Sequence, residues 1–176
     1  MVLEIGFYPS VFHNLESDTT GKMGGAIDSS AALSASLNSF FPEGVSDYIG
    51  QSEKLRFQTL YVKNTGLSTI NNPRVFLNNV KHVGQISIFN SLIDSASVTG
   101  STATGSVTGY NGVWSTTADF SEPIGLANAS PFTGLGTAIT SLAPGAYVGF
   151  VIRQKINDNL PTEIGASTTI GIIGEV

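Results

Sequence analysis

Apolar and polar residues alternate along several short stretches of this chain, which is the pattern of β-strands with one buried face. The clearest stretch spans residues 146–156 (AYVGFVIRQKI). One of its faces is apolar and contains Val148, Phe150, Ile152 and Ile156. The opposite face contains Tyr147, Gly149, Arg153 and Lys155. We expect the first face to lie in a core and the second to meet solvent.

Other segments have the composition of strands. Residues 55–63 (LRFQTLYVK) are rich in aromatic and β-branched side chains, which favour a pleated surface. Further strands are predicted at 74–77, 83–89 and 168–173. Pro73 cannot donate to a ladder, so it is expected at the first position of its strand. The predicted core contains Leu60, Val62, Ile88, Val148, Phe150 and Ile152.

Two turn signals support an antiparallel arrangement. Asn111 and Gly112 tolerate the positive φ angles of a type I′ hairpin turn. Pro144 and Gly145 suit the two central positions of a type II turn that leads into the strand from Ala146. About eight to ten short strands at such spacing indicate an all-β fold. The predicted fold is an antiparallel two-sheet sandwich, either immunoglobulin-like or jelly-roll-like.

The N-terminal segment, residues 1–52, is predicted to add a strand and an arm to a β-sandwich domain at residues 53–176. Within the arm, residues 27–41 have apolar side chains at helical spacing, and Asp28 could cap a first turn. Several serines in the same stretch compete for the backbone hydrogen bonds of a helix. Two alternatives stay open here, one short helix or an ordered loop.

The arm combines glycines with many large apolar residues. Exposed apolar surface of this kind marks contacts with other chains. Six residues are therefore predicted to make protein contacts: Phe7, Phe12, Leu33, Leu37, Phe40 and Phe41. The alternative is that the arm closes the sandwich's own core, since such residues are often simply buried.

Composition excludes several classes of function. The chain has 8 Lys and Arg against 13 Asp and Glu, and its basic residues are scattered, so nucleic acid is not an expected partner. It has no cysteine, which excludes disulfides and thiolate metal sites. No stretch reaches the ~18 apolar residues of a membrane span. The first nine residues lack the features of a signal peptide, so we expect synthesis in a cytoplasm.

Residues that could carry chemistry do not converge. His13 and His82 are far apart and have no companions at metal-ligand spacing. Asp119 and Glu122 are interpreted as turn residues rather than a catalytic pair. We therefore predict no catalytic, cofactor-binding or metal-binding residues, and no enzymatic activity. Trp114 has two interpretations, a ligand-stacking side chain or an ordinary buried aromatic, and the second is favoured.

Two segments resemble immunoglobulin-like sandwich domains. One is residues 61–66 (YVKNTG) with residues 69–77 (TINNPRVFL), and the other is residues 139–152 with its Leu-Ala-Pro-Gly turn. The chain also resembles uncharacterised virion proteins of tailed bacteriophages. That resemblance rests on residues 23–27 (MGGAI), the stretch LNSFFP from Leu37, and residues 55–64 (LRFQTLYVKN).

The resemblance implies a structural protein of the virion, made in the host cytoplasm. The implied role is capsid decoration or cement, or a component of the head–neck or tail. Its implied partners are major capsid or tail and neck subunits and further copies of the same chain, without nucleic acid or membrane. The alternative function is a receptor- or carbohydrate-binding module of a phage tail or surface adhesin.

Overall fold

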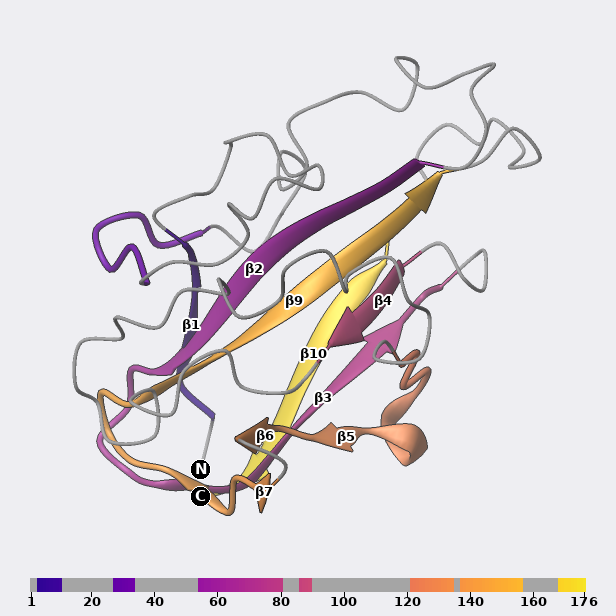
Figure 1. Cartoon of the computed structure of the whole chain (residues 1–176). Coiled ribbons are helices and arrows are strands. Elements are labelled where there is room, and N and C mark those ends of the chain that lie inside the picture. The colour runs from indigo at the N-terminus through magenta and orange to yellow at the C-terminus, as the bar shows by residue number, and fades with distance from the viewer. Residues whose placement is uncertain are drawn as a thin grey trace.

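In the computed structural model, which describes residues 3–10, 27–33, 54–80, 86–89, 121–134, 137–156 and 168–176, the chain forms two packed antiparallel β-sheets (Figure 1). These residues contain strands and one short 3-10 helix, η6 (Leu126–Asn128), and no α-helix. The prediction of an all-β, two-sheet sandwich is confirmed.

The first sheet has four strands in the order β1-β2-β9-β4, and neighbouring strands are antiparallel. The strands are β1 (Ile5–Pro9), β2 (Lys54–Asn64), β9 (Tyr147–Ile156) and β4 (Ile86–Phe89). The central ladder joins β2 to β9, from Lys54 opposite Ile156 to Lys63 opposite Tyr147. Strand β1, from the segment 1–52, pairs with β2 along its whole length. Segments far apart in the sequence thus form one sheet.

The second sheet is built around β3 (Ile70–Asn78). Strand β10 (Thr169–Glu175) pairs along one side of β3. On the other side lie two short strands, β5 (Ser130–Pro131) and β8 (Ser141–Leu142). A separate ladder joins β6 (Thr133–Gly134) to β7 (Thr137–Ala138). Among the described strands, β10 therefore forms one edge of this sheet, and the short strands form the other.

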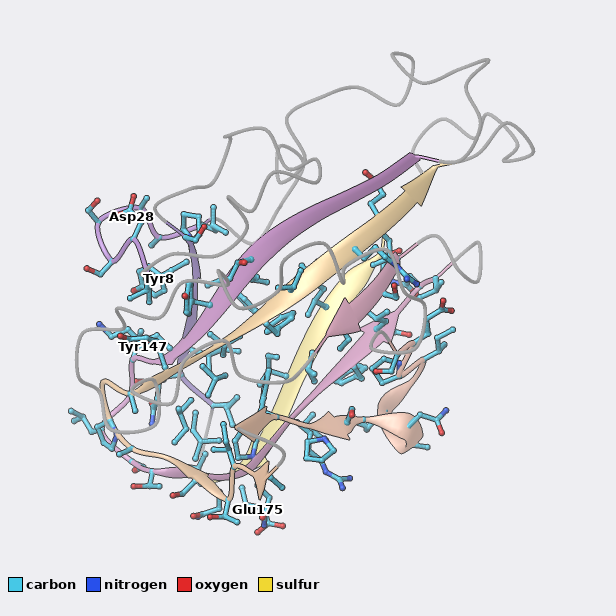
Figure 2. The ribbon with its side chains drawn as sticks, in the orientation of Figure 1. Tyr8, Asp28, Tyr147 and Glu175 are labelled. Atoms are coloured by element: carbon cyan, nitrogen blue, oxygen red, sulfur yellow. The ribbon has the colours of Figure 1, made fainter. Side chains whose placement is uncertain are left out.

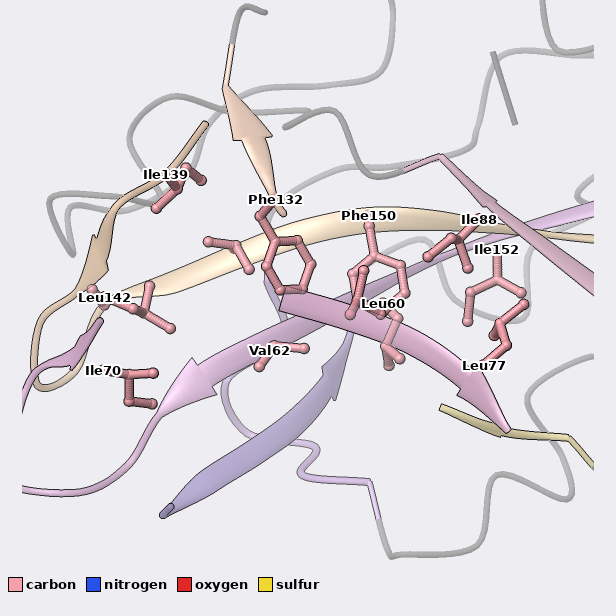
Figure 3. Packing of buried hydrophobic residues seen from close by; sticks show 13 residues of the cluster. Leu60, Val62, Ile70, Leu77, Ile88, Phe132, Ile139, Leu142, Phe150 and Ile152 are labelled. Carbon is pink, nitrogen blue, oxygen red and sulfur yellow. The ribbon is translucent and has the colours of Figure 1, made fainter. Parts of the chain in front are cut away.

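The core lies between the sheets, where apolar side chains from both meet (Figure 3). All six predicted core residues belong to it, and each is at most 2% exposed. The second sheet and its connections contribute Ile70, Val75, Leu77, Phe132 and Leu142. The ring of Phe132 packs against that of Phe150, with 5.6 Å between the centroids. Burying one side chain of this size stabilises a fold by about 1.5–3 kcal/mol, so this layer holds the sheets together.

The second face of β9 differs from the prediction. Tyr147, Val151 and Arg153 on this face are buried, although solvent exposure was expected. For Tyr147, the cause is aromatic packing on the outer side of the first sheet. The ring of Tyr61 lies over Gly149, its cross-strand partner, and meets the ring of Tyr147 edge to face at 5.8 Å. Both faces of β9 are therefore packed, and only the first belongs to the layer between the sheets.

Pro73 also differs from the prediction, because β3 begins at Ile70 and the proline lies inside the strand. The register between β3 and β10 shifts here, so that Asn72 and Pro73 together face Gly174. This is a β-bulge, and Asn72 adopts a positive φ of 48° within it. A bulge is one of the few positions inside a sheet that tolerate proline, because the ladder is already interrupted there.

Residues 27–33 form a loop that returns to β1. The Asp28 carboxylate accepts hydrogen bonds from the N–H and the hydroxyl of Ser30, at 3.1 and 2.6 Å, which lowers the pKa of Asp28. Leu33 then donates its N–H to the carbonyl of Phe7 at 2.7 Å. The open alternative is therefore settled as a loop for this part of the predicted helix, while residues 34–41 lie outside the described ranges.

The turn at 143–146 has the expected geometry. The N–H of Ala146 bonds to the carbonyl of Ala143 at 2.9 Å, and Gly145 has a positive φ of 80°, as a type II turn requires. Asn64, at the end of β2, makes two backbone hydrogen bonds to this turn. Its backbone N–H bonds to the carbonyl of Ala146, and its carbonyl accepts the N–H of Gly145, both at 2.9 Å.

The side chain of Asn64 makes three more hydrogen bonds. Its amide nitrogen donates to the carbonyls of Ser68 and Leu142 at 2.8 and 2.9 Å, and its oxygen accepts the N–H of Gly66 at 3.0 Å. The residue is only 1% exposed. Asn64 thus ties the connection after β2 to the connection before β9.

We expect Asn64→Asp to lower the free energy of unfolding by about 3 kcal/mol, because a carboxylate cannot donate to two buried carbonyls. Burial beside those carbonyls raises the pKa of the introduced carboxyl above its unfolded value. The loss should therefore shrink as pH falls through that folded pKa, since the protonated form is uncharged and donates one bond. Urea unfolding at several pH values measures both effects. Asn78→Asp, at an exposed position of β3, is the matched control and should change stability by less than about 0.5 kcal/mol.

We also expect Gly149→Ala to destabilise the fold by roughly 1–3 kcal/mol, because the new methyl group would lie 2.6 Å from the ring of Tyr61. Thermal unfolding of the two single variants and the double variant with Tyr61→Ala forms a cycle. In the Tyr61→Ala background the cost of Gly149→Ala should disappear, since the clashing ring is gone. An unchanged cost in that background would contradict this explanation.

Candidate functional site

Acidic and basic side chains do not form a site in the part of the chain that the structure describes. No group of three His, Cys, Asp or Glu residues there could hold a metal ion. Asp28 uses its carboxylate within its own loop. No helix among these residues is long and apolar enough to cross a membrane. His13, His82 and Asp119 lie outside the described ranges.

Two buried hydroxyl groups lie on the outer face of the first sheet. Thr59 and Ser87 are 1% and 0% exposed, and neither hydroxyl has a hydrogen-bond partner. A hydroxyl becomes a nucleophile only when a base accepts its proton. The cross-strand partners on β9 are Val151 for Thr59 and Arg153 for Ser87, and neither can act as that base. Among the described cross-strand partners, neither hydroxyl therefore has an activating base.

The tyrosines on the same face could have formed a platform for a sugar, but their rings are used for packing. Tyr61 and Tyr147 are 0% and 5% exposed, and they contact each other. Tyr8 is partly buried and has the amine of Lys63 above its ring at 5.9 Å (Figure 2). The two buried rings present no free face for stacking.

Two of the six predicted contact residues are described. Phe7 and Leu33 are partly buried and pack against the core between the sheets. Both therefore have a role within the chain, and any contact with a partner stays a prediction for them. The other residues of the predicted site lie outside the described ranges: Phe12, Leu37, Phe40, Phe41 and Trp114.

The outer edges of the first sheet are both covered. On β1, the carbonyls of Pro9 and Phe7 accept the N–H groups of Asp28 and Leu33 at 2.9 and 2.7 Å. On β4, Ile88 and Ser121 exchange two hydrogen bonds of 2.9 Å. The chain's own segments therefore occupy backbone groups that a foreign strand would otherwise use.

The side of β3 away from β10 is covered as well. The N–H of Leu77 bonds to the carbonyl of Pro123, and its carbonyl accepts the N–H of Gly125, both at 2.9 Å. Strands β5 and β8 pair along the rest of this side. The N–H and the carbonyl of Leu77 thus point away from β10. The Leu77–Ile170 pair of the ladder is therefore one without mutual hydrogen bonds.

The Leu77–Ile170 pair fixes which backbone groups of β10 point toward β3 and which point away from it. Because backbone direction alternates along a strand, Thr169, Gly171 and Ile173 bond to β3. The N–H and carbonyl groups of Ile170 and Ile172 point out of the sheet instead. No described residue pairs with them.

Within residues 169–173 this edge has no charge and no proline, and the β-bulge at Gly174 and the charge of Glu175 lie at its end. Residues 168–174 (TTIGIIG) include no charge and no proline. Natural edges are normally blunted by lysine, proline, a short length or a covering segment. An uncharged edge with two free backbone positions is a template for another strand. We name the outward side of residues 169–173 the β10 edge, and it is the candidate interaction site.

Sequence reasoning predicted a strand at 168–173 but missed its place at an edge. The available signal was the lack of lysine and proline in a β-rich segment. Among the described residues, the exposed large apolar side chains lie in three separate segments: Leu67 in the connection from β2 to β3, Leu126 in η6 and Val176 after β10. Single exposed apolar residues of this kind are normal and mark no site.

Comparison with known proteins adds no relative: no family model, no curated protein and no solved structure matches this chain.

Proposed function

We propose that this chain is a non-enzymatic structural protein of a tailed-bacteriophage virion, which acts through protein–protein contacts. Its role is capsid decoration or cement, or a component of the head–neck or tail. The observation that carries the proposal is the β10 edge, whose residues 169–173 carry no charge and, among the described residues, pair on one side only. The virion setting is supported by the sequence resemblance of residues 23–27 and 55–64.

The β10 edge suits assembly because strand pairing has a fixed direction and register. Each added strand forms backbone hydrogen bonds, and the flanking side chains select the partner. In a particle, many copies of a modest contact act together, so avidity replaces individual affinity. A small sandwich with one open edge can therefore remain attached without a large interface.

The described polar groups support a structural role over catalysis. The buried side chain of Asn64 makes three hydrogen bonds, which join two connections of the fold. The buried hydroxyls of Thr59 and Ser87 have no base opposite them. These groups stabilise or fill the sandwich and leave no reactive arrangement on its described surface.

The alternative, a receptor- or carbohydrate-binding module, would rest on aromatic stacking. The buried rings of Tyr61 and Tyr147 do not favour it, and Trp114 lies outside the described ranges. Glycan-array binding that depends on Trp114 would support this module over the structural role.

We expect the chain to copurify with phage particles at a fixed ratio to the major capsid or tail protein, because a structural subunit occupies defined positions. Mass spectrometry of gradient-purified particles measures this ratio. The variant Thr169→Lys/Ile173→Lys, which charges the β10 edge, should fall to background in particles, while Leu67→Lys should incorporate normally. Absence of the unaltered chain from purified particles would contradict the proposal.

We expect His13→Ala and His82→Ala to leave incorporation and infectivity unchanged, because neither histidine has metal-ligand or catalytic companions in the sequence. Circular dichroism confirms that each variant is folded. Loss of infectivity in a folded histidine variant would favour an enzymatic or metal-dependent function instead.

A further inference from the structure

We infer that the β10 edge pairs with the β10 edge of a second copy of this chain, antiparallel, so that two second sheets join into one continuous sheet. The inference names the partner of the edge on which the proposed function rests. It requires the two copies to be related by a two-fold axis, as in most protein dimers.

The outward backbone groups determine which registers are possible. Ile170 and Ile172 point out of the sheet, so each must face an outward-pointing residue of the partner strand. An antiparallel two-fold centred on Gly171 meets this condition. Ile170 then faces Ile172 of the second copy, and each such pair exchanges two hydrogen bonds. Four hydrogen bonds form across the junction.

Gly171 suits the position at the axis. It would face Gly171 of the second copy in a pair without mutual hydrogen bonds, where the Cα atoms approach to about 4.5 Å. The ring of Phe76 lies directly over Gly171, within 2.3 Å of where a Cβ atom would be. Phe76 is only partly buried. Pairing brings the two Phe76 rings to either side of the axis, above the two glycines.

The inward face of the strand is also complementary to itself. Ile170 and Ile172 point toward the core layer and are each only partly buried at this edge. In the paired strands, Ile170 lies beside Ile172 of the second copy, and the apolar layer continues from one sandwich into the next. The dimer thereby removes from water apolar surface that a single copy leaves exposed.

Charge favours the antiparallel direction. Glu175 is the only charged residue of β10. With the axis at Gly171, the two Glu175 residues lie at opposite ends of the junction, eight residues or about 27 Å apart. A parallel arrangement in register would place them side by side. Ile173 faces Thr169 of the second copy, so no like charges lie opposite each other on β10.

Cysteine cross-linking tests the register directly, because the chain has no cysteine of its own. Thr169 and Ile173 of opposite copies form a close pair of about 4.5 Å between Cα atoms, which suits a disulfide. We expect a mixture of Thr169→Cys and Ile173→Cys chains to cross-link under mild oxidation. Neither variant alone should do so, because its own cysteines would lie about 13 Å apart.

Sedimentation velocity of the full chain tests the assembly itself. We expect a concentration-dependent dimer of twice the 18.4 kDa chain mass. Thr169→Lys/Ile173→Lys should sediment as a folded monomer, because it places lysines opposite each other across the junction. Leu67→Lys is the matched control and should remain dimeric. Circular dichroism confirms the fold of each.

A monomeric unaltered chain, or equal cross-linking of the single variants and the mixture, would overturn the inference. The proposed function is tested separately by the particles. If the unaltered chain is monomeric but still enters particles, and charging the β10 edge prevents this, the edge has another partner than a second copy. The virion role is then retained. A dimer that is absent from particles supports the inference and overturns the virion role.

Discussion

The hydrogen bonds of Asn64 are the constraint on which the rest of the sandwich depends. This one residue makes five hydrogen bonds: one each through its backbone N–H and carbonyl, two through its side-chain amide nitrogen and one through its side-chain oxygen. They join the connection from β2 to β3, where the chain passes between sheets, to the turn that starts β9. The end of β2, the start of β9 and the connection to β3 are therefore all tied to Asn64. Because the site is buried, any unmet bond carries its full desolvation cost.

Local chemistry made much of this fold predictable. Alternation identified the strand that became β9, and aromatic and β-branched composition identified β2. The Pro-Gly turn before β9 has the conformation that its two residues favour. Pro73 was misplaced because a β-bulge depends on the opposing strand, and Gly174 lies a hundred residues away in sequence. The outer face of β9 was misread because its polar and glycine residues look solvated until Tyr61 is placed over Gly149.

The candidate site could be predicted only in part. The composition of residues 168–174 shows a strand without charge, and it does not show which strand will lie at an edge. That depends on long-range pairing: β5 and β8, of two residues each, occupy the far side of β3, so that β10 is outermost among the described strands. The aromatic and apolar residues of the N-terminal segment were the stronger sequence signal. Four of them, Leu3, Ile5, Phe7 and Leu33, pack against the core of the chain.

Unequal protection of the sheet edges, among the described strands, is the feature on which the proposed assembly rests. A protein that must avoid all association covers or charges every edge, because an open one recruits strands without regard to identity. Here, short loop segments bond to β1 and β4 at little cost in chain length. The seven residues of β10 have no such cover among the described residues, although one lysine would have sufficed. Within the chain, Gly171 accommodates the ring of Phe76, which lies within 2.3 Å of where a Cβ atom would be. In the proposed dimer the same glycine would also allow the backbone of a second strand to approach closely.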